Sequence, residues 1–329
     1  MMPSDAGEHR REMSVAAADG AAIETVSVPH MCVCICTYKR PMPLKRLLDK
    51  IHVQETQGLF TYSVVIVDND EGRSGEATVA ESRKRSAIEM DYYVEPRQGI
   101  AYARNKAVQS AVGDYLALID DDEFPIATWL LRMFNTCNTY KVDGVLGPVR
   151  RHFEGTPPSW LRKSRILDRP VHATGLKVDW RESRTGNVLL RRRVIDGDEI
   201  VFRPEFRSGE DKDFFCRKIE QGFSFIWSAD AEVFEVLPPS RWKRSYFIKR
   251  ALFNGAMGTK MGKFGGRDVL KAVVAIPIYG FLLPFSLLFG QHRFMTLMMK
   301  FSNHLGRLLA VAGIHVVSGA HLAEDDECR

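Results

Sequence analysis

The sequence predicts an α/β fold built on a doubly wound, mostly parallel sheet flanked by helices. Two observations lead to this prediction. Short apolar runs alternate with stretches of helical periodicity from Met31 onward, and two of those runs end abruptly in carboxylates, at Asp68 and Asp120. Strands that alternate with helices pair in parallel through right-handed crossovers. The chain has 329 residues, 45% hydrophobic and 26% charged, so it can bury a sizeable core.

The expected elements follow from the spacing of the apolar residues. A first strand at 31–36 precedes a helix near 44–51, where leucine and isoleucine recur at helical spacing. The elements expected next are a strand at 62–67, a helix at 76–85, a short strand at 91–94, a turn at 96–99 and a helix from 100 to about 112. A strand at 115–119 closes this series, and its continuous apolar character predicts burial on both faces.

Three consecutive carboxylates, Asp120, Asp121 and Asp122, follow the strand at 115–119. In an extended chain Asp120 and Asp122 point to one side and Asp121 to the other. Adjacent carboxylates repel one another unless a cation lies among them, and Mg²⁺ or Mn²⁺ is held by one or two carboxylates together with substrate phosphates. The alternative is a solvated acidic turn in which Glu123 caps the following helix.

The acidic ends of two strands are expected at one edge of the sheet. Ligands bind at the carboxyl ends of strands in open α/β sheets, so Asp68 and Asp120 predict a nucleotide pocket beside a metal. The sequence has no Gly-x-Gly-x-x-Gly turn after its first strand and no Gly-x-x-x-x-Gly-Lys-Ser/Thr motif. Phosphates would therefore be held by a metal and by basic side chains.

A second acidic cluster, Glu210, Asp211 and Asp213, occupies the first turn of a predicted helix. Carboxylates there can simply complement the helix dipole. Alternatively, one ionised carboxylate acts as a general base. Two separate acidic clusters fit a displacement in which one holds the metal that offsets the charge of the leaving group and the other takes the proton.

Six motifs in this order resemble glycosyltransferase family 2, and the likeness runs from about Met31 to Pro239. They are Cys36-Thr37-Tyr38-Lys39-Arg40-Pro41, Val67-Asp68-Asn69-Asp70, Gly99-x-x-x-x-Arg104-Asn105, the three aspartates, Thr185-Gly186-Asn187-Val188-Leu189-Leu190-Arg191-Arg192 and Gly209-Glu210-Asp211-Lys212-Asp213. Within the family, Leu146-Gly147-Pro148-Val149 and Val236-Leu237-Pro238-Pro239 are most similar to succinoglycan-type exopolysaccharide glucosyltransferases.

The resemblance implies a GT-A fold, a UDP-sugar donor with UDP-glucose as first choice, a divalent Mg²⁺ or Mn²⁺, and inversion at the anomeric carbon. The residues that it implies for nucleotide-sugar binding are Thr37, Tyr38, Arg40, Asp68, Arg104, Asp120 and Asp121, with Thr37 and Asp68 on the uridine. The implied metal ligands are Asp122, Asp120 and Glu235, the last standing about where many members carry a histidine. The implied catalytic residues are Asp211, as the base, and its neighbour Glu210. A retaining enzyme would need a nucleophile close to the anomeric carbon instead.

The C-terminal part predicts membrane association. The segment 272–290 is an uncharged run of 19 residues that contains Pro277 and Pro284. As a straight helix it would reach about 28 Å, just short of a hydrocarbon core, so the prolines favour a kinked or re-entrant hairpin. The basic cluster at 241–250 would then contact anionic head groups. The alternative is a buried helical subdomain.

The expected domains are a flexible tail at 1–29, a GT-A domain at 30–262, a membrane-associating helical region at 263–322 and an acidic tail at 323–329. The basic stretch 150–184 is either a surface loop or the binding site of a lipid-linked oligosaccharide acceptor. A net charge of +5 is too mild to predict nucleic-acid binding.

The alternating cysteines of the first strand are expected to be buried, reduced thiols, which together with a lipid-linked acceptor places the protein on the cytoplasmic face of the inner membrane. One alternative function is a sugar-phosphate nucleotidyltransferase, which should carry a glycine- and arginine-rich loop directly after the first strand. Another is a non-catalytic, membrane-anchored protein that binds nucleotide sugars.

Overall fold

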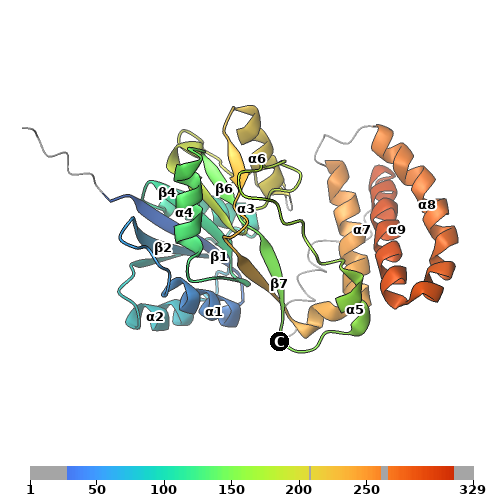
Figure 1. Ribbon diagram of the computed structural model, residues 1–329, viewed down its shortest axis with the longest axis horizontal. Helices are drawn as coiled ribbons and strands as arrows, with labels where there is room; N and C mark the ends of the chain where they lie inside the picture. The colour runs from blue at the N-terminus through green and yellow to red at the C-terminus, as the bar shows by residue number, and fades with distance from the viewer. Residues whose placement is uncertain (1–27, 207–208, 261–265, 315–329) are drawn as a thin grey trace, which may run out of the picture.

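The computed structural model describes residues 28–206, 209–260 and 266–314. A seven-stranded sheet has the order β3-β2-β1-β4-β8-β6-β9 (Figure 1). Its strands are β1 (His30–Thr37), β2 (Thr61–Asp68), β3 (Met90–Val94), β4 (Tyr115–Asp120), β6 (Gly144–Leu146), β8 (Val188–Arg191) and β9 (Phe225–Trp227). Strands β1 to β4 are parallel neighbours, whereas β8 runs antiparallel to β4 and β6. The predicted mostly parallel sheet is confirmed.

Helices cover both faces of this sheet because the side chains of its strands alternate. On β1, Met31, Val33 and Ile35 pack on one face, and Cys32 and Cys34 pack on the other. The first face is covered by α1 (Pro41–Ile51), α2 (Glu76–Lys84) and α4 (Trp129–Thr139), and the second by α3 (Ile100–Ser110) and α6 (Glu210–Glu220). Each strand and helix expected between 31 and 119 is present, within a few residues of its predicted ends.

A second, three-stranded sheet has the order β5-β10-β7. Its strands are β5 (Glu123–Pro125), β7 (Val149–Phe153) and β10 (Val233–Leu237). The alternative in which Glu123 caps a helix is wrong, because Glu123 pairs with Glu235 in this sheet and α4 begins only at Trp129. Short 3₁₀ turns, η1 (Arg192–Val194) and η2 (Pro239–Trp242), follow β8 and β10.

The C-terminal helices form a separate layer beside the sheet domain (Figure 1). Helix α9 (Gln291–Val311) lies between α7 (Arg244–Lys260) and α8 (Gly266–Ser286), and it also contacts α5 (Ser159–Ser164). The backbones of α7 and α9 approach closely: a Cβ at Gly255 would lie 2.0 Å from the carbonyl oxygen of Asn303, and one at Gly306 would lie 2.1 Å from that of Leu252. Only glycine allows these two approaches.

Helix α8 continues through Pro277 and Pro284, and the chain then turns at η3 (Leu287–Phe289) into α9. The prolines therefore do not split 272–290 into two helices, and the predicted hairpin is formed by α8 with α9. At about 1.5 Å per residue, the 21 residues of α8 reach roughly 31 Å. Within the described part of the chain, 266–289 is the one helical stretch long and apolar enough to cross a membrane, and little of it is buried.

The predicted domain limits are only partly covered by the structure. The boundary after residue 262 falls between α7 and α8, yet α7 packs against α9 and so belongs with the C-terminal helices as much as with the sheet domain. The tail at 1–29, apart from its last two residues, and the tail at 323–329 lie outside the described residues.

Candidate active site

The carboxyl ends of β1, β2 and β4 lie side by side at one edge of the sheet. In the register of the strands, Thr37 is opposite Asp68, and Cys36 is opposite Asp120. The two acidic strand ends that the sequence indicated therefore meet at the same edge, as expected for a ligand site in an open α/β sheet.

Asp68 organises the loop that follows β2. Its side chain is fully buried, and its carboxylate accepts hydrogen bonds from the backbone N–H of Gly75 at 2.7 Å, the backbone N–H of Asp70 at 3.0 Å and the hydroxyl of Tyr92 at 2.8 Å. These contacts fix the loop beside the site. Contact of Asp68 with a nucleotide base stays a prediction.

Asp121 lies outside the lining of the cavity described below, which Asp120 and Asp122 share, although residues 121 and 122 form a turn rather than the extended chain assumed in the prediction. The hydroxyl of Thr37 donates to its Oδ2 at 2.8 Å, and Arg40 Nη1 lies 3.3 Å from its Oδ1. Burial raises the pKa of Asp121 to about 7, against the opposing effect of Arg40. Tyr38 is half-buried in the same β1–α1 loop, with the ammonium of Lys39 5.1 Å from the centre of its ring.

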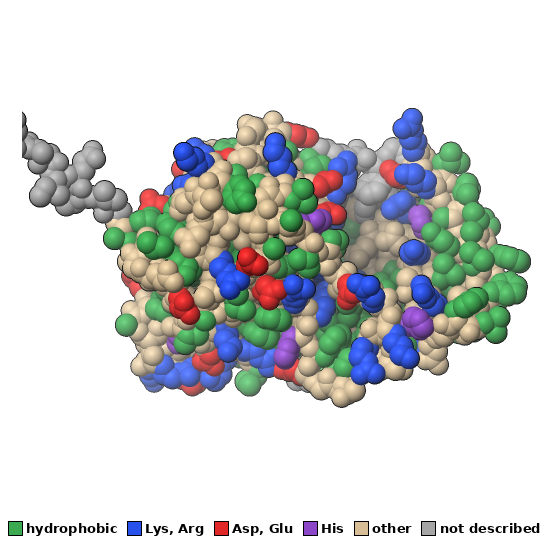
Figure 2. Space-filling model, viewed as in Figure 1, with side chains coloured by type: hydrophobic (Ala, Val, Ile, Leu, Met, Phe, Trp, Pro, Cys, Tyr) green, Lys and Arg blue, Asp and Glu red, His purple; other side chains and the backbone are tan. Residues whose placement is uncertain are grey.

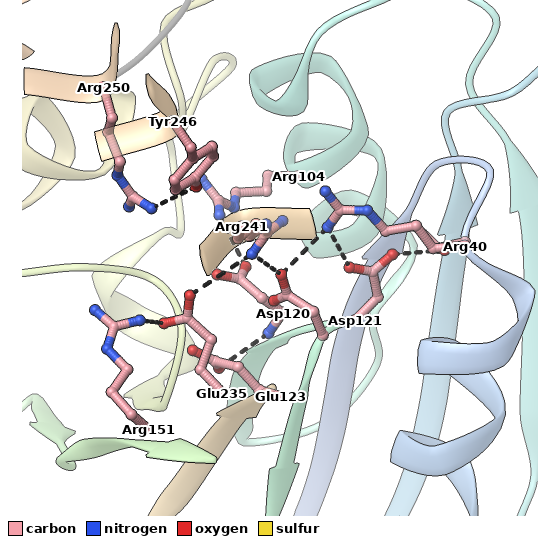
Figure 3. Close-up of polar contacts among 12 residues, drawn as sticks. Arg40, Arg104, Asp120, Asp121, Glu123, Arg151, Glu235, Arg241, Tyr246 and Arg250 are labelled. Carbon is pink, nitrogen blue, oxygen red and sulfur yellow. Dashed lines mark hydrogen bonds and ion pairs between the residues drawn. The ribbon is translucent and has the colours of Figure 1, made fainter. Parts of the chain in front are cut away.

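Asp122 lies between two guanidinium groups (Figure 3). Arg40 Nη1 and Arg241 Nη1 each lie 3.3 Å from its Oδ2. Burial, followed by the nearby charge of Glu235, raises the pKa of Asp122 despite both arginines. A third strong positive charge at this carboxylate, such as a divalent cation, would favour its ionised form.

Arg104 joins the two acidic clusters. It is almost fully buried, its Nη2 donates to Asp120 Oδ1 at 3.0 Å, and its Nη1 donates to Glu210 Oε1. Burial acts to lower the pKa of Arg104, but the carboxylates of Asp120, Glu210 and Asp211 outweigh burial and raise it. One side chain on α3 thus holds the end of β4 against the start of α6.

Glu210 and Asp211 face different surroundings although they are neighbours. Glu210 is buried, burial raises its pKa, and its Oε2 has no hydrogen-bond partner within 28–206, 209–260 and 266–314. Asp211 instead lines the cavity described below, where its Oδ1 accepts the backbone N–H of Lys212 at 2.8 Å. Gly209 begins the helix with a φ of +87°, a left-handed conformation that glycine adopts without strain.

A cavity of about 670 Å³ lies between the acidic clusters and α7. Of the residues predicted from the sequence, those that line it are Arg104, Asp120, Asp122, Asp211 and Glu235. Those outside its lining are Thr37, Tyr38, Arg40, Asp68, Asp121 and Glu210. The predicted metal and base residues thus share one space, and the residues predicted for the uridine lie at the sheet edge beside it.

Two glutamates that face each other across β5 and β10 have pKa values shifted in opposite directions. Glu235 pairs with Arg151 and, at 2.8 Å, with Arg169, and these and other arginines outweigh burial, so its pKa lies below the usual value. For Glu123, burial and the neighbouring carboxylates raise the pKa well above its usual value. Glu235 is thus already neutralised by arginine, and its role as a metal ligand stays a prediction.

The carboxylates that line the cavity include two possible ligands for a divalent cation. Within 28–206, 209–260 and 266–314, no group of three or more His, Cys, Asp or Glu side chains is arranged to hold a metal. Asp120 and Asp122 both face the cavity, and Mg²⁺ or Mn²⁺ needs only one or two carboxylates when a diphosphate supplies further oxygens. These two residues therefore fit the predicted metal.

The Thr185-Gly186-Asn187 motif shapes the floor of the cavity. A Cβ at Gly186 would lie 2.6 Å from Glu123 Oε1 and 3.0 Å from Asp120 Oδ2, so only glycine fits against these carboxylates. Asn187, with a φ of +67°, donates from its side-chain amide to the carbonyls of Pro148 at 2.9 Å and Ala231 at 2.8 Å. Gly186 and Asn187 are therefore structural, because they fix how closely the loop before β8 approaches the carboxylates of Asp120 and Glu123.

Part of the cavity wall was not predicted from the sequence. Tyr246 and Arg250 of α7 line it, and so does Arg241, although the whole 241–250 cluster was expected to contact lipid head groups. The spacing of Tyr246, Arg250 and Asn254, four residues apart, is the signal that could have indicated one helix face. Of the cluster, Lys243 and Arg244 remain exposed.

Comparisons with known proteins agree with this geometry. The model of the family described as Glycosyl transferase family 2 matches residues 32–198. The chain is 33% identical over 232 residues to the succinoglycan biosynthesis protein ExoM of Rhizobium meliloti, covering 69% of this chain and 73% of ExoM. Glycosyltransferase AglE of Haloferax volcanii is 24% identical over 207 residues, covering 63% of this chain and 66% of AglE.

One similar solved structure shares the fold of this chain. Mannosyltransferase PcManGT from Pyrobaculum calidifontis, solved in complex with GDP-Man and Mn²⁺, superposes with a TM-score of 0.57 at 16% identity, covering 88% of this chain and 89% of that one. At this identity the likeness shows a shared fold.

Proposed function

The chain belongs to glycosyltransferase family 2, and from this membership we propose that it is an inverting, metal-dependent enzyme of exopolysaccharide or cell-surface polysaccharide synthesis. The proposed donor is a UDP-sugar, with UDP-glucose to be tested first, and the proposed acceptor is a lipid-linked saccharide. The glycosyltransferase activity and the GT-A fold follow from the family itself. Membership also removes the support for a nucleotidyltransferase.

One observation carries this proposal: two acidic groups from different elements face one cavity. Asp120 and Asp122 come from the end of β4, and Asp211 comes from the start of α6. In a single displacement the acceptor hydroxyl attacks from the face opposite the leaving diphosphate. Asp211 would take the proton of that hydroxyl, while the β4 end would hold the diphosphate.

The metal is proposed at Asp122 and Asp120, and PcManGT, with which the chain shares its fold, was solved with Mn²⁺. When bound, such a cation offsets the negative charge of the leaving diphosphate. The protein's own part is to position the groups. Arg104 holds Asp120 in place, and Arg40 and Arg241 supply positive charge next to Asp122.

The cytoplasmic face of the inner membrane is the proposed location. Helix α8 exposes apolar side chains on its outer surface, where Figure 2 shows hydrophobic residues gathered at the end of the molecule formed by the C-terminal helices. The most exposed apolar residues here are Leu270 and Phe281 of α8, with Leu288 and Phe289 of the adjoining η3. An exposed apolar surface of this kind is typical of a membrane contact.

The test is a calorimetric titration of the detergent-solubilised full chain with UDP-glucose, other UDP-sugars and GDP-mannose, each with and without Mn²⁺. We expect one UDP-sugar to bind only when Mn²⁺ is present, and the Asp122→Asn variant to lose that dependence. Binding without any effect of metal would refute the metal-dependent mechanism. Slow hydrolysis of the bound donor would separate an enzyme from a protein that only binds nucleotide sugars.

A further inference from the structure

One wall of the cavity carries more positive charge than its carboxylates balance. Arg169, Arg184 and Arg250 line this wall, and Arg151 lies behind it against Glu235. Glu235 is shared by Arg151 and Arg169, while among the described residues the guanidinium of Arg250 donates only to the hydroxyl of Tyr246, at 2.9 Å. A wall with this charge attracts an anion.

Arg184 supports this conclusion by itself. It is half-buried in the cavity wall and forms no hydrogen bond or ion pair with the described residues, and burial, followed by the charge of Arg169, lowers its pKa to about 10. The next residue, Thr185, also lines the cavity, and its buried Oγ1 has no hydrogen-bond partner among the residues that the structure describes. A buried hydroxyl without a partner costs free energy, and beside a guanidinium that forms no ion pair it indicates an anionic ligand in the cavity.

This wall is separate from the acidic edge proposed for the donor. In Figure 3, Arg40 lies on the β1 side of Asp120 and Asp121, whereas Arg250 and Arg151 lie on the opposite side. Arg250 comes from α7, which packs against α9, and α9 packs against the apolar helix α8. Arg250 thus reaches the wall from the layer of C-terminal helices, whose outer end carries the exposed apolar surface (Figure 2).

We propose that Arg169, Arg184 and Arg250 form a second anion subsite that binds the diphosphate of the lipid carrier on which the acceptor saccharide is built. Arginine presents planar, paired N–H donors that match phosphate oxygens, and three of them suit two linked phosphates. The Thr185 hydroxyl supplies a fourth donor. This inference rests on the proposed function, and it names residues for the acceptor that are distinct from those of the donor.

The experiment titrates the full chain in detergent with farnesyl diphosphate, farnesyl monophosphate and farnesol, with and without saturating UDP and Mn²⁺. Arg184→Gln removes the unpaired charge, and Arg184→Lys restores a charge at the same position. Arg150→Gln is the matched control, because Arg150 is exposed, lies outside the cavity lining and pairs with Glu232. Thermal denaturation of each variant checks that it folds.

We expect the diphosphate to bind in the presence of UDP, and Arg184→Gln to weaken its binding about tenfold to a hundredfold, as loss of a hydrogen bond to a charged group does. Arg184→Lys should recover part of this loss, and Arg150→Gln should change nothing. Competition between UDP and the lipid diphosphate, or equal binding of farnesol, would overturn the inference. If the UDP-sugar titrations fail while farnesyl diphosphate binds, the donor proposal is wrong and the anion subsite stands.

Discussion

Replacing Arg104 by methionine should destabilise the protein and separate its two acidic clusters. The side chains of Arg104 and Glu210 are 10% and 5% exposed, so this is a buried ion pair. Removing one partner of such a pair costs about 3–5 kcal/mol, since the other charge stays buried without compensation. The side chain of the second partner, Asp120, is 41% exposed, so loss of the ion pair between Arg104 and Asp120 adds about 0–1 kcal/mol.

The loss of stability caused by Arg104→Met should be larger at higher pH. Burial already raises the pKa of Glu210, and without Arg104 it should rise further. The folded variant then holds a proton that the unfolded chain has lost, so its stability falls as the pH rises above the usual glutamate value. Urea denaturation at pH 5 and pH 8 should therefore show the larger loss for Arg104→Met at pH 8.

Two further variants complete this test. Glu210→Gln removes the stranded charge, so the double variant should recover part of the loss in a double-mutant cycle. Arg150→Met breaks the exposed pair with Glu232, whose side chains are 45% and 29% exposed, and should cost about 0–1 kcal/mol. Should Arg104→Met match Arg150→Met in its free energy of unfolding at both pH values, the bridging role of Arg104 would be refuted.

Other variants test the site and the fold separately. Asp122→Ala should abolish sugar transfer and the effect of Mn²⁺ on donor binding in calorimetry; unchanged turnover would contradict the metal assignment. Asp211→Asn should abolish transfer in a product assay yet leave donor binding largely intact, and normal turnover would remove its role as base. Because burial raises the pKa of Asp121 to about 7, the free energy of unfolding should fall as the pH rises from about 4 to about 7. Asp121→Asn should flatten this fall when it is measured by urea denaturation. An unchanged slope would count against the raised pKa of Asp121. Gly255→Ala places a Cβ 2.0 Å from a carbonyl oxygen of α9 and should lower the free energy of unfolding by about 1–3 kcal/mol in thermal denaturation. Gly280→Ala meets only an ordinary contact at 3.8 Å and should lower it less. Equal losses of stability would argue against the close crossing of α7 and α9.

Much of the candidate site could be predicted from the sequence because it depends on local geometry. The alternation of an extended chain put Asp120 and Asp122 on one side and Asp121 on the other, and Asp120 and Asp122 do share the cavity lining without Asp121, although β4 ends at Asp120 and a turn follows. Continuous apolar runs followed by acids likewise identified the ends of β2 and β4, and parallel pairing then brought Asp68 and Asp120 to one edge. The order of the motifs was sufficient for the family.

The C-terminal region shows where local pattern was insufficient. Prolines predicted a break within 272–290, but α8 continues through both of them and uses α9 as its hairpin partner. In the sequence, Arg241 and Arg250 are recognisable only as members of a basic cluster. Whether they face lipid or a cavity depends on how α7 packs against the sheet domain.

The sequence by itself determined the sheet, the acidic strand ends and the family, since these follow from residue periodicity and motif order along the chain. Only the tertiary structure decided which charges meet. Arg104 pairs with Glu210, which lies 106 residues farther along the chain than Arg104, and Arg151 neutralises Glu235 across 84 residues. Such pairs depend on how distant segments pack, and so does the cavity that Arg184 lines together with Arg250 of α7.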